Sequence, residues 1–64
     1  MSKYTIVEST MRSFNGYSFE LSEFSVKAVF DALNLKQRAY NYYRKDDIII
    51  IITTHYTIKI KEEK

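Results

Sequence analysis

The chain has 64 residues, a net charge of +2 at pH 7, and neither cysteine nor proline. A chain of this length is one domain near the lower size limit for burying its own core, and without cysteine or a His/Cys cluster no disulfide or zinc ion can brace it. Hydrophobic residues make up 45% of the chain and aromatic residues 16%, which excludes a disordered protein. We therefore expect residues 1–64 to form a single domain, stabilised by dense packing or by a second copy.

No stretch approaches the roughly 20 apolar residues of a membrane span, and the first residues do not read as a signal peptide. We expect a cytoplasmic protein without membrane contact. Patterns typical of catalysis are also missing, because the serines have no acid–base partner pattern and no Gly-rich phosphate loop is present. The lone His55 stands near an expected turn and reads as a surface residue. We expect no enzyme activity, no cofactor and no bound metal.

The N-terminal third predicts a strand followed by a segment with two interpretations. Residues 3–10, KYTIVEST, are rich in β-branched and aromatic residues and predict a strand. Asn15-Gly16 is a signal for a type I′ hairpin turn, after which residues 17–21 would return antiparallel to the first strand. The competing interpretation is a short helix with one face made of Tyr17, Leu21 and Phe24. The sequence leaves both open.

A clear helical pattern follows over residues 23–33. Ser22 is a good N-cap, and Leu21 with Val26 matches a hydrophobic staple. Polar residues recur every four positions, while apolar residues cover nearly all of the remaining circumference. A helix with so narrow a polar stripe is packed on more than one side.

Residues 36–44, KQRAYNYYR, can be read as a strand or as a second helix. As a strand they alternate poorly, since Tyr42 and Tyr43 are adjacent. As a helix they place Leu35, Ala39 and the tyrosines on one side. The opposite side is then an acid-free polar and basic face made of Gln37, Arg38, Asn41, Arg44 and, at its edge, Lys45. The β-propensity of tyrosine opposes this, but pattern outranks propensity, so the helix is the preferred prediction.

Two helices joined across Asn34-Leu35 make a helix-turn-helix, and residues 26–45, VKAVFDALNLKQRAYNYYRK, resemble that of Cro-type phage repressors and their relatives. The stretch LNLKQRAYN is similar to the turn and the start of the recognition helix in that family. The resemblance implies a small dimeric regulator that binds double-stranded DNA. On this interpretation Gln37, Arg38 and Asn41 read bases, while the phosphates are held by Lys36, Arg44 and Lys45.

Residues 48–60, IIIIITTHYTIKI, predict one long strand or a hairpin that turns near residues 53–55. The unbroken apolar phase of the even positions favours one strand or an odd-length loop. The first half is apolar on both faces, which is typical of a strand covered on both sides. Two helices cannot cover all of this surface, so we expect a homodimer. Its predicted interface consists of Ile49, Ile51, Tyr56 and Ile58.

The expected fold is thus a small α+β domain, a helix-turn-helix flanked by N-terminal strands and a C-terminal strand or hairpin. The alternative is a ββαββ antiparallel sheet with one helix. The two folds carry two functions: a dimeric DNA-binding transcriptional regulator, or a non-enzymatic protein-interaction module such as a phage-type inhibitor of a host protein. The second would use a Tyr/Arg patch over residues 40–44 on an exposed strand. The conformation of residues 36–44 decides between them.

Overall fold

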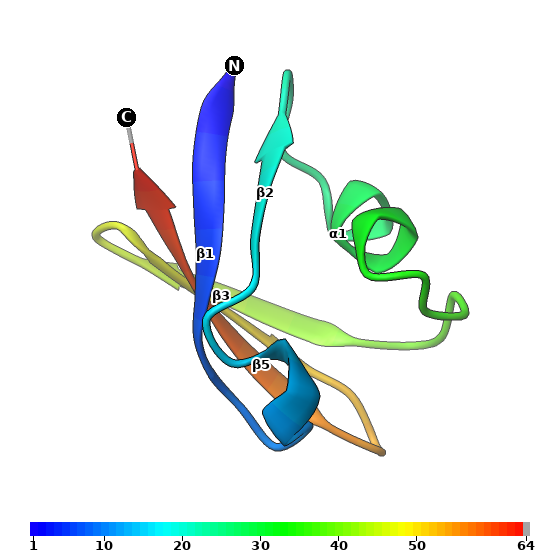
Figure 1. Cartoon of the computed structure of the whole chain (residues 1–64). Coiled ribbons are helices and arrows are strands. Elements are labelled where there is room, and N and C mark those ends of the chain that lie inside the picture. The colour runs from blue at the N-terminus through cyan, green and yellow to red at the C-terminus, as the bar shows by residue number, and fades with distance from the viewer. Residues whose placement is uncertain (64) are drawn as a thin grey trace.

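The computed structural model describes residues 1–63, which form one α-helix and a five-stranded sheet (Figure 1). Neighbouring strands are all antiparallel, in the order β2-β1-β5-β4-β3. The strands are β1 (Ser2–Ser9), β2 (Ser18–Leu21), β3 (Asn41–Lys45), β4 (Ile48–Ile52) and β5 (Thr57–Glu63), with helix α1 (Val26–Ala32) between β2 and β3. The α+β class is confirmed, and the fold fits the one-helix alternative rather than the helix-turn-helix.

The N-terminal strands form the predicted hairpin, with Tyr4 opposite Phe19. A 3-10 turn (Arg12–Phe14) precedes the reversal, and Tyr17 N–H donates to the carbonyl of Phe14 at 2.9 Å. Asn15 has φ −61° and ψ 126° while Gly16 has φ 83°, which are the angles of a type II turn rather than the expected type I′. Glycine is needed because its φ is positive. The competing short helix over this segment is wrong.

Strand β1 carries a bulge at Val7. Ile6 lies opposite Ile60 on β5, but Glu8 already lies opposite Lys59, so Val7 has no counterpart. A bulge bends its strand and increases the local twist. Figure 1 shows the result, since β1 and β2 stand nearly upright while β3 crosses them at a steep angle.

Helix α1 begins later than predicted. Ser25, not Ser22, is the N-cap, and its Oγ accepts from the backbone N–H of Ala28 at 3.0 Å. The C-terminus is closed by a Schellman motif, in which Asn34 has φ 58° and Leu35 N–H donates to the carbonyl of Phe30 at 2.8 Å. Asn34 thus takes the left-handed conformation that ends the helix, and no second helix follows it in residues 35–63. With seven residues, this helix of the described chain is too short to cross a membrane.

The predicted second helix over residues 36–44 is wrong. Residues 35–40 are irregular, and residues 41–45 form β3, which pairs with β4 so that Tyr43 lies opposite Ile50. The isoleucines offer a ladder partner that the isolated helical pattern does not take into account, and tyrosine favours strands. A tight turn through Asp46, with φ 56°, returns the chain into β4.

Strands β4 and β5 form a hairpin rather than one long strand, and its loop (residues 53–56) is even in length, contrary to the prediction. The loop contains no Gly or Asn, the usual turn residues, and hydrogen bonds to the Thr53 side chain hold it instead. Its Oγ1 accepts from the backbone N–H groups of His55 and Tyr56 at 3.2 and 3.1 Å. The even loop changes the phase, so the odd positions of β4 share a face with the even positions of β5.

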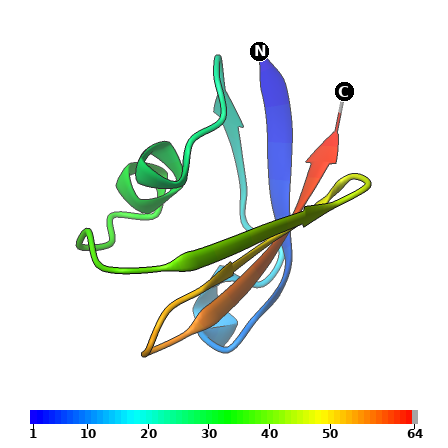
Figure 2. The ribbon, with the colours of Figure 1, turned by 180° about the vertical axis from the view of Figure 1, so that it is seen from behind.

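We call the sheet face that carries Ile49 and Ile51 the inner face, and the opposite one the outer face. Helix α1 lies on the inner side of the sheet, as the views from the two sides show (Figures 1 and 2). Its buried Val26, Val29 and Phe30 belong to the same core as the inner-face isoleucines. No helix of residues 1–63 covers the outer face. The core between the two layers consists of Tyr4, Ile6, Val26, Val29, Phe30, Leu33, Ile49, Ile51, Tyr56, Ile58 and Ile60.

Candidate interaction surface

The last strand of the sheet, β3, is the most exposed element of the fold. We call residues 40–45 the β3 edge; every residue in it is exposed, and three tyrosines lie 43–58% open to solvent: Tyr40, Tyr42 and Tyr43. One side of β3 pairs with β4, and no strand of residues 1–63 pairs with the other. Alternate backbone N–H and C=O groups of an edge strand point outward without a ladder partner. The β3 edge therefore offers both backbone hydrogen bonds and aromatic side chains.

On the outer face, the β3 edge continues a mixed apolar and basic surface. Tyr43 lies beside Ile50 on β4, which lies beside Lys59 on β5. Two residues further along β3, Lys45 lies beside Ile48 of β4, which lies beside Lys61 of β5. The isoleucines in these rows are only half buried.

On the inner face, aromatic stacking holds β3 in place. The ring of Tyr42 stacks on Phe24 at 5.9 Å between centroids, with 23° between their planes. Phe24 in turn contacts Tyr4 at 5.5 Å. Tyr42 therefore connects the edge strand to the segment that leads into α1.

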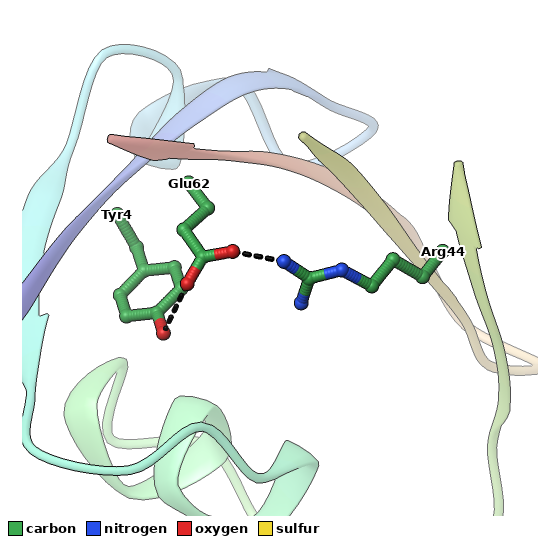
Figure 3. Close-up of polar contacts among 3 residues, drawn as sticks. All are labelled: Tyr4, Arg44 and Glu62. Carbon is green, nitrogen blue, oxygen red and sulfur yellow. Dashed lines mark hydrogen bonds and ion pairs between the residues drawn. The ribbon is translucent and has the colours of Figure 1, made fainter. Parts of the chain in front are cut away.

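A polar cluster also ties β3 to the rest of the sheet. Arg44 Nη2 donates to Glu62 Oε1 on β5, and Tyr4 Oη donates to Glu62 Oε2 at 3.2 Å (Figure 3). The Glu62 side chain is only 10% exposed, whereas that of Arg44 is 39% exposed. Burial and the hydrogen bond to Glu62 raise the pKa of Tyr4, and the hydrogen bond to Glu62 raises the pKa of Arg44. The cluster thus holds a neutral phenol and a guanidinium on one carboxylate.

The six residues predicted to contact nucleic acid do not form one surface. Arg38 lies over the ring of Tyr56, 5.9 Å from its centroid, and Gln37 Nε2 makes a long contact of 3.5 Å with the carbonyl of Lys27. Arg44 is on the inner face of β3 and engages Glu62. The remaining three are exposed but separate: Lys36 lies in the irregular segment, while Asn41 and Lys45 lie at opposite ends of β3 on its outer face.

The four residues predicted for a subunit interface lie inside the monomer. Ile49, Ile51 and Ile58 have no exposed surface, and Tyr56 is 7% exposed. Helix α1 and the first hairpin cover them, so one copy buries the side chains that a second copy was expected to cover. Any contact between copies has to use another surface.

Two open hollows adjoin the β3 edge. The first, of about 400 Å³, lies at the start of β3 and is lined by Ala39, Tyr40, Asn41, Ile52, Thr53 and Thr54. The second, of about 350 Å³, lies at its end and is lined by Arg44, Asp46, Asp47 and Glu62. Within residues 1–63, no three His, Cys, Asp or Glu side chains are grouped as a metal site requires.

The sequence patterns did not single out Glu62 or Phe24 as parts of the site. Glu62 stands in a run of charged residues that follows Ile60, yet it shares the phase of Ile58 and Ile60 in an alternating strand. That phase puts its carboxylate on the inner face, where a cation has to accompany it. Phe24 was assigned to the helix, and its contact with Tyr42 depends on the tertiary fold.

Comparison with known proteins adds no family to this description. No family model matches the chain, and no curated protein or solved structure matches it.

Proposed function

We propose that this protein is a small non-enzymatic interaction module that binds a partner protein by accepting an extended segment along the β3 edge. The observation that carries the proposal is that all five residues 41–45 are exposed in an extended strand at the edge of the sheet. In binding by strand addition, main-chain hydrogen bonds supply affinity, and alternate side chains supply specificity.

The side chains of the β3 edge are of the type that dominates protein interfaces. Tyrosine and arginine are enriched among the residues that contribute most to binding energy. Tyr43 is 58% exposed and projects from the outer face, next to half-buried Ile50. The hollow beside Tyr40 and Asn41 is wide enough to receive a side chain of the added segment.

The β3 edge is also held in its extended form before a partner arrives. Tyr42 is stacked on Phe24, and Arg44 is paired with Glu62, so two side chains of the inner face fix the strand. A binding surface that is already ordered loses less conformational entropy on association. The outer-face residues stay available to the partner.

DNA recognition through a helix-turn-helix has little support in this geometry. Reading the major groove in that way requires a recognition helix, whereas residues 36–44 form an irregular segment and most of a strand. The charge near the end of β3 is not strongly basic either. Asp46 and Asp47 follow Lys45 directly, and Arg44 faces Glu62.

The proposal is tested by selecting random seven-residue peptides on the immobilised protein and titrating the selected peptides into ¹⁵N-labelled protein. We expect amide shift changes confined to residues 40–45 and the adjoining ends of β4. Tyr43→Ala should weaken binding at least tenfold, whereas Tyr17→Ala, a tyrosine of similar exposure far from β3, should leave it unchanged.

The proposal is overturned if no extended segment of any kind binds the β3 edge, or if the shift changes lie on another surface. Binding to random duplex DNA is measured in parallel at several salt concentrations. A steep salt dependence that flattens in Arg38→Ala and Arg44→Ala would favour the DNA-binding regulator instead.

A further inference from the structure

The five residues of β3, Asn41-Tyr42-Tyr43-Arg44-Lys45, form a strand that is complementary to itself. An antiparallel pair of identical strands about a two-fold axis at Tyr43 brings Tyr43 opposite Tyr43. Arg44 then lies opposite Tyr42 of the second copy, and Lys45 lies opposite Asn41 of the second copy. No cation faces a cation, and an aromatic pair such as Tyr43 opposite Tyr43 stabilises an antiparallel sheet.

We infer that the segment accepted by the β3 edge is β3 of a second copy, in this register; the inference rests on the proposed function. It makes one continuous sheet across two copies, with inner faces on the same side. Tyr43 already lies beside Ile50, so the two copies together form an unbroken outer-face row of Ile50, Tyr43, Tyr43 and Ile50. On the inner side, Arg44 keeps its ion pair with Glu62 and also contacts the ring of Tyr42 of the second copy, a cation–π contact.

Other registers fit less well. A shift of two residues that centres the axis on Arg44 places two guanidinium groups opposite each other. A shift that centres it on Tyr42 moves Lys45 opposite residue 39, outside the strand, and leaves only residues 41–43 paired. Parallel pairing in register puts Arg44 beside Arg44 and Lys45 beside Lys45. Like charges directly opposite each other destabilise a pair of strands.

The charges at the ends of β3 favour a second copy over an acidic segment. Asp46 and Asp47 follow the strand, and an acidic partner strand would be repelled there. In the antiparallel dimer this acidic turn lies beyond Asn41 of the second copy, towards its residues 36–40. That segment carries Lys36 and Arg38 and no acid. A contact of this length is smaller than a standard interface, so we expect a reversible dimer that depends on concentration.

A cysteine at position 43 tests the register directly, since the chain has no cysteine of its own. Directly opposed residues of antiparallel strands have Cα atoms roughly 4.5–5.5 Å apart, within the range of a disulfide. Under glutathione oxidation, Tyr43→Cys should form a covalent dimer at least ten times faster than Tyr17→Cys, a control of similar exposure. Equal rates would overturn the inference.

A charge exchange provides a second, reversible test by analytical ultracentrifugation. Asn41→Lys places a lysine opposite Lys45 at both ends of the dimer and should weaken it severalfold. Adding Lys45→Glu creates two Lys–Glu pairs and should restore the dimer, whereas Lys45→Glu alone should change it little. A double variant that stays as weak as Asn41→Lys contradicts the register. Circular dichroism establishes that each variant is folded.

The outcomes separate this inference from the proposed function. If the wild-type chain stays monomeric at millimolar concentration while selected peptides still bind the β3 edge, the second copy is not the partner and the proposed function stands. If neither a second copy nor a peptide binds there, both are overturned.

Discussion

Arg44 on β3 and Glu62 on β5 form an ion pair across the intervening strand β4. Edge strands usually depend on one neighbour alone, but here a side chain connects the edge to the strand two places away. Glu62 also accepts from Tyr4 on β1, so the connection extends over four strands of the sheet (Figure 3). The exposed strand is therefore held from its inner face, and its outer face and open edge remain accessible.

We predict that Arg44→Met destabilises the fold more than Lys45→Met. Arg44→Met removes the ion pair to the Glu62 carboxylate, which is only 10% exposed, whereas Lys45 is exposed on the other face of the same strand. Urea unfolding of both variants measures the difference. Equal unfolding midpoints would show that the pair across β4 adds nothing to stability.

Removing the hydroxyl of Tyr4 should lower stability at neutral pH. Tyr4→Phe deletes the hydrogen bond to Glu62 while keeping the buried ring, and we expect a loss of about 1 kcal/mol in the free energy of unfolding. For a chain of this size that corresponds to about 4–8 °C in Tm. Differential scanning calorimetry at neutral pH measures it.

The same variant should have a different dependence on alkaline pH. The pKa of Tyr4 is raised in the folded state by burial and by Glu62, so its contribution to stability is complete below the unfolded pKa of about 10 and is lost as pH rises through the folded value. Above about pH 10 the stability gap between wild type and Tyr4→Phe should therefore narrow. A gap that is constant or grows with pH contradicts the raised pKa.

Neighbouring residues of β4 should respond in opposite ways to the same change. Ile51 is fully buried on the inner face, so Ile51→Lys places an unpaired charge in the core and should leave the chain unfolded. Ile52 is half buried on the outer face, so Ile52→Lys should still fold. Circular dichroism distinguishes the two variants. A folded Ile51→Lys would refute the assignment of the two faces.

The start of α1 can be checked with two serines. Ser25→Ala removes the cap of the Ala28 N–H and should cost about 1 kcal/mol, whereas Ser22→Ala should change stability by less than about 0.5 kcal/mol. Chemical denaturation of both variants decides which residue begins the helix. The opposite ranking would move the cap to Ser22.

Local signals were sufficient where residues interact with near neighbours. The strand over residues 3–10 follows from its β-branched content, and the chain reversal at Gly16 follows from the positive φ that glycine allows. The sequence did not decide between a returning strand and a short helix after Gly16, and pairing with β1 makes it a strand. The α+β class could be predicted for the same reason.

The prediction failed where tertiary partners decide. Residues 36–44 have a helical pattern, but pairing of Tyr42 and Tyr43 with Ile51 and Ile50 makes the second half a strand. An edge strand has little need for regular alternation, because residues on both of its faces are exposed. The phase of β4 was misjudged because Thr53 closes an even-length loop without Gly or Asn. The contact between Arg44 and Glu62 was not predicted for the same reasons, because these two residues meet only when β3, β4 and β5 pair in the observed register.

Hydrogen exchange at the backbone amides of β3 tests most directly whether its edge accepts another strand. In dilute protein, the amides of residues 41–45 that face β4 should be protected, while the alternate amides on the open side should exchange rapidly. At high protein concentration, or with a selected peptide, the open-side amides should exchange at least tenfold more slowly. If they exchange equally fast under all three conditions, the β3 edge is not a strand-binding site.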